Sequence, residues 1–114
     1  METQAAVDAL SALAQEARLK VYRVLVQAGL EGLPAGAIGE ELGVPAATLS
    51  FHLKELKNAG LVRCEKRGRS RIYTPDFEAM ERLVSFLTEN CCQGVGGCIP
   101  SAERTGSRAG DAPC

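Results

Sequence analysis

Residues 46–62 read AATLSFHLKELKNAGLV, and this stretch decides which fold the chain can adopt. Leu49, Leu53 and Leu56 recur at helical spacing, so they predict the buried face of a helix that runs from about Ala46 to Asn58 and ends at Ala59-Gly60. The opposite face holds small or polar residues and one aromatic: Ala47, Ser50, Phe51, Lys54 and Asn58. An ordinary solvated face seldom carries a phenylalanine, so this face is predicted to meet a partner.

Three further helices are predicted upstream. One runs from about Pro34 to Leu42, and Gly43-Val44-Pro45 then makes a tight turn into the helix at 46–58. Helix, short turn and helix is the helix-turn-helix arrangement. A helix from about Glu16 to Gln27 is apolar around most of its circumference, which predicts burial at the centre of the domain. The first helix, from about Thr3 to Ala14, carries apolar side chains at helical spacing: Val7, Leu10, Leu13 and Ala14.

The segment after Gly60 predicts a basic β-hairpin. Residues 61–73 read LVRCEKRGRSRIY, in which two short strands flank a turn at Gly68 and the tip carries Lys66, Arg67 and Arg69. Residues 45–75 hold seven bases and two acids, although the net charge of the whole chain is −1. Positive charge gathered in one segment is what a phosphate-binding surface requires. A basic hairpin in this place is a wing, which would grip the DNA backbone or minor groove.

These features predict a DNA-binding module in which the helix at 46–58 enters the major groove. Ser50 can hydrogen-bond a base edge or a phosphate, Phe51 can contact a thymine methyl group, and Lys54 and Lys57 suit phosphates. The predicted DNA-binding residues lie on this helix and on the hairpin: Ala47, Thr48, Ser50, Phe51, Lys54, Lys57, Lys66, Arg67, Arg69 and Arg71.

Two stretches of sequence resemble the ArsR/SmtB family of winged-helix repressors. They are residues 14–21, AQEARLKV, and residues 48–62, TLSFHLKELKNAGLV, followed by a wing that ends in Tyr73. The resemblance covers about residues 5–92. It implies a mainly α-helical winged helix-turn-helix fold with the order α-α-α-α-β-β-α. It also implies a homodimer that binds operator DNA as apoprotein and releases it when a metal ion binds. Family dimers are built from the first and last helices, here about Thr3 to Ala14 and about Pro75 to Asn90.

The last predicted helix suits that interface. Thr74-Pro75-Asp76 supplies a capping residue, a first-turn proline and an acid near the helix N-terminus. An apolar stripe follows, which Cys91 continues: Phe77, Met80, Val84 and Leu87. The pattern also fits an internal core helix, but a domain this small gains much from burying such a stripe against a partner. The predicted interface residues are Leu10, Leu13, Met80, Val84 and Leu87.

Three of the five cysteines lie close together in the sequence, at Cys91, Cys92 and Cys98. Soft thiolate ligands select soft ions, and As(III) and Sb(III) favour three of them in a pyramidal arrangement. Cys91 and Cys92 can converge only if the helix frays, and the glycine-rich residues 93–97 supply the freedom to bring back the third sulfur. These three residues are therefore the predicted metalloid site.

Other family sites lack their ligands here. His52 is the only histidine, and it is predicted to be packed or hydrogen-bonded behind the reading face, whereas the family's zinc and nickel sites need several histidines. Gly43 and Pro45 stand where the well-known arsenic-responsive pattern has Cys-Val-Cys. Cys64 and Cys114 have no partner at useful spacing and are treated as incidental.

The function predicted from the sequence is a transcriptional repressor that As(III) or Sb(III) releases from operator DNA, with no organic cofactor. A thiol-based redox sensor, a Cd(II) or Pb(II) sensor, and a thiol-dependent arsenic-handling enzyme stay open as alternatives. A non-enzyme is predicted because a cysteine hydrolase needs a histidine near its thiol, and the lone His52 belongs to a different element.

The predicted organisation is a winged-helix and dimerisation domain at 1–92 and a flexible tail at 93–114 that contains Cys98. The N-terminal residues lack the basic and apolar regions of a signal peptide, and no apolar run approaches the roughly 18 residues of a membrane span. The sequence therefore predicts a cytoplasmic protein without a membrane partner, in a compartment where thiols stay reduced.

Overall fold

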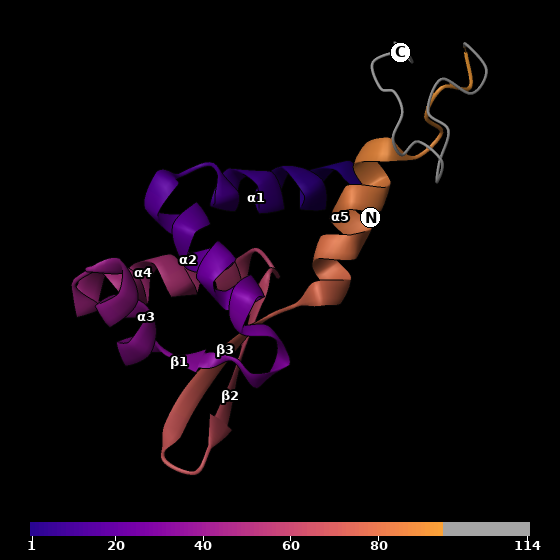
Figure 1. Cartoon of the computed structure of the whole chain (residues 1–114). Coiled ribbons are helices and arrows are strands. Elements are labelled where there is room, and N and C mark those ends of the chain that lie inside the picture. Colours follow the sequence, from indigo (N-terminus) through magenta and orange to yellow (C-terminus); the bar gives the residue numbers. More distant parts are fainter. Residues whose placement is uncertain (95–114) are drawn as a thin grey trace, which may run out of the picture. The chain divides into compact units, whose positions relative to one another are not determined.

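The computed structural model describes residues 1–94 of the chain. The chain divides into two units, Met1–Val84 and Ser85–Cys114, and the boundary falls inside the last helix. The elements follow in the order α1 (Thr3–Leu13), α2 (Glu16–Ala28), the 3-10 helix η1 (Gly29–Glu31), β1 (Leu33–Pro34), α3 (Ala35–Leu42), α4 (Ala46–Asn58), β2 (Val62–Arg67), β3 (Ser70–Pro75) and α5 (Phe77–Thr88) (Figure 1). This is a winged helix-turn-helix fold, as predicted, with one additional short strand.

The central helix of the first unit is α2, which packs against α1, α3, α4 and β3. Its N-terminus is capped by Gln15, whose side-chain oxygen accepts a hydrogen bond from the Arg18 backbone amide at 2.7 Å. Its inner face includes Leu25, which is fully buried. Leu19 and Val26 are exposed, so the prediction of burial around most of the helix is wrong on one side. A domain this small has too few elements to surround a helix completely.

The helix-turn-helix unit consists of α3 and α4, and α4 has the bounds expected from the sequence. Between them, Gly43 adopts a left-handed conformation with φ +67°. Helix α4 ends in a similar way, because Gly60 has φ +80° and the Leu61 amide bonds back to the Leu56 carbonyl at 3.0 Å. Leu56 and Leu61 are both buried, which anchors the start of the wing to the core.

The wing is the β2–β3 hairpin, which projects away from the helices (Figure 1). Its register pairs Arg67 with Ser70 across the turn at Gly68. The sheet is antiparallel with the order β1-β3-β2, and β1 pairs Leu33 with Tyr73. The sequence did not predict β1, because a strand of two residues has no alternating pattern and its proline was assigned to the helix that follows.

Helix α5 begins two residues later than predicted, because Thr74 and Pro75 complete β3. Asp76 is the capping residue: its Oδ1 accepts a hydrogen bond from the Ala79 amide at 3.0 Å. The helix ends at Thr88 rather than near Asn90. In the described part of the chain, no helix is long and apolar enough to span a bilayer.

Candidate nucleic-acid interface and cysteine cluster

The two faces of α4 separate as the leucine spacing predicts. Leu49, Leu53 and Leu56 are buried against the rest of the first unit, together with His52, which is 6% exposed. All ten residues predicted to contact DNA are exposed. Among them, Phe51 stands out because 53% of this large apolar side chain is accessible to solvent. The helix therefore presents small, polar and basic side chains around one aromatic ring, a combination suited to a DNA groove.

Arg18 of α2 connects α4 to α1 and α2. Its Nε lies 3.4 Å from Nδ1 of His52, and one terminal nitrogen donates to the Ala12 carbonyl of α1 at 3.3 Å. The guanidinium also lies over the Phe51 ring, 5.7 Å from its centroid. Burial lowers the pKa of His52, and the neighbouring Arg18 charge lowers it further. Both effects favour the neutral imidazole, in which Nδ1 can accept a hydrogen bond.

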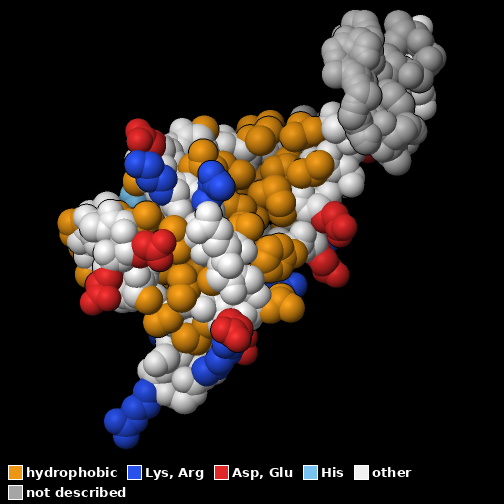
Figure 2. Space-filling view, viewed as in Figure 1, with side chains coloured by type: hydrophobic (Ala, Val, Ile, Leu, Met, Phe, Trp, Pro, Cys, Tyr) orange, Lys and Arg blue, Asp and Glu red, His pale blue; other side chains and the backbone are white. Residues whose placement is uncertain are grey.

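The hairpin carries the exposed basic residues expected of a wing, and blue side chains project at its outer end in Figure 2. Arg67 differs from its neighbours, because it donates to the Glu31 carbonyl of η1 at 2.9 Å and pairs with Glu65 at 3.1 Å. It therefore ties the hairpin to the segment that precedes β1. Its predicted role as a DNA contact remains a prediction, as do those of Lys66 and Arg69.

Cys91 and Cys92 lie just beyond α5, where the chain leaves the helical path. The Cys91 amide still bonds to the Thr88 carbonyl at 3.1 Å, but Asn90 and Cys92 have positive φ angles of 60° and 64°. This turn brings Sγ of Cys91 to 3.0 Å from Sγ of Cys92. The helix thus ends before the cysteine pair, and the two sulfurs lie side by side. The role of these cysteines as metalloid ligands stays a prediction.

The cysteines differ in their state. Cys91 and Cys64 are free thiols, whereas Cys92 takes part in a disulfide bond. Within residues 1–94, no group of three or more His, Cys, Asp or Glu side chains converges on one point. Two of the five cysteines, the predicted ligand Cys98 and the incidental Cys114, lie outside the described residues, as does most of the predicted flexible tail.

Helices α1 and α5 present apolar side chains outward. Helix α1 turns small alanines toward its own unit and leaves Val7 and Leu10 exposed, while α5 buries Leu83 and exposes Val84. Apolar side chains gather over the α1 side of the molecule in Figure 2. The predicted interface residues follow this pattern: Leu10, Val84 and Leu87 are exposed, and Leu13 and Met80 are half-buried.

Comparisons with known proteins agree with this geometry. A family model described as a helix-turn-helix domain matches residues 13–65. A cadmium resistance transcriptional regulatory protein CadC homolog of Staphylococcus aureus is 33% identical, over 75% of this chain and 70% of that protein. A candidate arsenical resistance operon repressor, ArsR, of Halobacterium salinarum is 41% identical, over 73% of this chain and 64% of that protein. The chain belongs to the ArsR/SmtB family.

A solved structure supports the assignment to the ArsR/SmtB family. It is the homodimeric winged helix-turn-helix DNA-binding domain of a possible ArsR-family regulator from Mycobacterium bovis, with a TM-score of 0.63 and 28% identity. The match covers 75% of this chain and 76% of that one. As a member of the family, the present chain is a DNA-binding transcriptional regulator.

Sequence reasoning missed the contacts that two residues of this ArsR/SmtB regulator make. Arg18 was noted only as part of a family string, and the contact of Arg67 with η1 was not anticipated. Arg18 is one of several charged residues of α2, beside Glu16, Lys20 and Arg23, so its position in the sequence is not a specific signal.

Proposed function

We propose that this protein is a transcriptional repressor that binds operator DNA as an apo homodimer and is released by As(III) or Sb(III) bound to Cys91, Cys92 and Cys98. The observation that carries the proposal is the cysteine pair directly after α5, with its sulfurs 3.0 Å apart. Membership of the family supports the DNA-binding role, and the cysteine pair is the basis for proposing a thiol-binding inducer.

The donor set suits a soft trivalent ion. Once Cys92 is reduced, its sulfur and that of the neighbouring Cys91 could share one soft centre, and Cys98 would add the third thiolate. Binding requires the thiolate forms, so the disulfide at Cys92 must first be reduced. The relative from Halobacterium salinarum, named for arsenical resistance, is consistent with this class of inducer.

The homodimer is inferred from the outward faces of α1 and α5. Val7 and Leu10 on α1, and Val84 and Leu87 on α5, are each more than two-fifths exposed. Exposed apolar residues on the two helices that the family uses for dimerisation are explained best by a second copy of the chain. The Mycobacterium bovis domain is homodimeric, which supports the same assembly here.

The regulatory mechanism follows from the position of the cysteines. They lie at the end of α5, so drawing their sulfurs together would reorganise the C-terminal end of a dimerisation helix. A change in the interface alters the spacing of the two α4 helices, which must fit successive major grooves. Reciprocity then requires operator DNA to weaken inducer binding by the same factor. The regulator would act in the cytoplasm, where its operator is found.

A second candidate is a redox-sensing repressor, and the state of Cys92 favours it. Cys92 takes part in a disulfide bond beside the free Cys91 thiol, so a cysteine of this cluster can be held in its oxidised state. An external two-electron oxidant such as diamide would form that disulfide from two thiols, and a dithiol reductant would break it. In that case an oxidant would release the DNA without any metalloid, and a dithiol reductant would restore binding.

One titration separates the candidates. The reduced protein is bound to its own promoter DNA, and release is followed by fluorescence anisotropy as As(III), Cd(II) or diamide is added. The proposal expects release by As(III) under reducing conditions, with the midpoint raised about tenfold or more in Cys91→Ser and Cys92→Ser. Cys64→Ser is the matched control and should respond like the unmodified protein. An unchanged As(III) midpoint in the first two variants would refute the metalloid site, and release by diamide alone would establish the redox candidate.

A further inference from the structure

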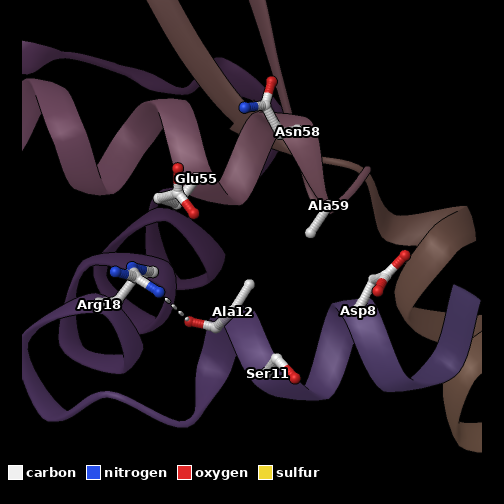
Figure 3. Close-up of a pocket in the computed structure, with 7 residues that line it drawn as sticks. All are labelled: Asp8, Ser11, Ala12, Arg18, Glu55, Asn58 and Ala59. Carbon is white, nitrogen blue, oxygen red and sulfur yellow. Dashed lines mark hydrogen bonds between the residues drawn. The ribbon is translucent and has the colours of Figure 1, made fainter.

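Three contacts of one guanidinium bring together elements that are distant in the sequence. Arg18 of α2 reaches the last turn of α1 through the Ala12 carbonyl, and it reaches α4 through His52 and Phe51. Figure 3 shows its bond to Ala12 at one wall of a pocket between these three helices. Each contact is long and individually weak, but they share one rigid, planar group.

The position of this group relates it to DNA recognition rather than to packing alone. His52 is buried behind the face of α4 that is predicted to read DNA, and Phe51 is on that face. A planar cation over the ring restricts the orientations that Phe51 can adopt, while the bond to His52 restrains the helix itself. The hydrogen bond from Arg18 to the Ala12 carbonyl fixes His52 and Phe51 relative to α1.

We propose that Arg18 is a positioning residue for operator recognition, which holds His52 and Phe51 of α4 in register with the C-terminal end of α1. This inference rests on the proposed DNA-reading face of α4. Because α1 is also a proposed dimerisation helix, Arg18 provides a physical connection between the dimer interface and the residues that read the operator.

The charged groups around His52 define how the connection depends on pH. Arg18 of α2 contacts the imidazole, and Asp8 of α1 and Glu55 of α4 line the adjacent pocket, which has a volume of about 450 Å³. A protonated His52 would lose its acceptor atom and place a buried cation beside Arg18. Operator affinity should therefore be full when His52 is neutral and should fall as the pH drops through its lowered pKa.

The test compares operator DNA with unrelated DNA of the same length. We expect Arg18→Met to weaken operator binding about tenfold, the equivalent of roughly 1.4 kcal/mol, while affinity for unrelated DNA and the salt dependence stay unchanged. Lys20→Met is the matched control, because it removes an exposed cation of the same helix, which pairs with Glu16 at 3.2 Å. An equal loss on both DNAs with a shallower salt dependence would make Arg18 a phosphate ligand and overturn the proposal.

The pH profile gives a second readout that a merely structural role would not change. Between about pH 8 and pH 5, the operator affinity of the unmodified protein should fall on acidification, and that fall should be absent in His52→Gln, whose amide oxygen can still accept from Arg18. If Arg18→Met does not fold, this profile decides alone. An unaltered profile in His52→Gln would refute the role assigned to the Arg18–His52 contact.

Two further variants distinguish a failure of the proposed DNA reading by α4 from a failure of the role assigned to Arg18. If Ser50→Ala and Phe51→Ala also leave the preference for operator DNA intact, then α4 does not read DNA with this face. If those variants lose the preference and Arg18→Met retains it, only the positioning role is wrong.

Discussion

Phe51 lies on the exposed face of α4, next to residues that form the buried face of the same helix. It follows a serine and precedes a buried histidine, yet more than half of its own surface remains exposed. Burying the exposed part of this ring against a partner would be favourable, which fits the proposed reading face of α4. The same helix carries Lys54 and Lys57, and in the proposed function its partner is the major groove, where the ring would contact a thymine methyl group.

Phe51→Ala should therefore change which operator sequences are preferred more than it changes overall affinity. The ring contributes apolar contact to one base position, whereas the phosphate contacts remain. Selection from a randomised operator library, compared with the unmodified protein, measures the change. A preference that is identical at every position would place Phe51 outside the interface.

Lys54→Ala should weaken operator binding and reduce the slope of log K against log salt by about 0.9, the amount expected for one phosphate contact. Binding is measured by anisotropy at several salt concentrations. Arg82→Ala on α5, where the arginine lies 4.0 Å from Glu78, serves as the control and should leave the slope unchanged. The placement of α4 in the groove would be wrong if both variants behave alike.

At the scale of elements, the wing depends on a contact with η1. Arg67 and Arg69 look equivalent in the sequence, but Arg67 donates to the Glu31 carbonyl at 2.9 Å. The hairpin is therefore held at its outer end as well as through its strand pairing. This restraint reduces the freedom that a projecting hairpin would otherwise lose when it binds DNA.

Arg67→Ala should increase amide hydrogen exchange in β2 and around Glu31, because the tether is removed, whereas Arg69→Ala should leave exchange unchanged. Arg69→Ala should instead lower the salt dependence of DNA binding. Exchange is measured by mass spectrometry on the free protein. Equal protection in both variants would mean that the tether contributes nothing in solution.

Gly32, between η1 and β1, is a second residue whose contacts hold this segment against the wing, because it packs closely on β3. It has φ +71°, and an added Cβ would lie 2.6 Å from the Tyr73 carbonyl oxygen and from two side-chain methyl groups. Gly32→Ala should lower the free energy of unfolding by about 1 to 3 kcal/mol or more, as measured in urea. Gly68→Ala is the control, since φ there is +64° but nothing lies within 4 Å, so it should cost less. Equal losses would show that backbone strain alone, and not crowding, accounts for the effect.

At the scale of the whole molecule, the apolar faces of α1 and α5 require a second copy in the proposed assembly. Leu87→Asp should therefore produce monomers or unfolded chains, because a charge would be buried in the interface without a partner. Sedimentation velocity and circular dichroism measure the two outcomes. Leu30→Asp is the matched control: Leu30 is 79% exposed on η1, which is neither of the two proposed interface helices, and its replacement should leave the dimer intact. A folded dimer in Leu87→Asp would place the interface elsewhere.

The sequence alone determined α4, its buried leucines and the hairpin after it, because periodicity and turn glycines are local signals that need no knowledge of the rest of the chain. It also singled out the cysteine pair after the last helix. Only the tertiary structure decided that Asp76 caps α5 and that Gly32 borders β3. The contacts of Arg18 with His52 and of Arg67 with Glu31 join residues 34 and 36 positions apart. No local pattern encodes such pairs, since they arise only when packing of the core brings separate elements together.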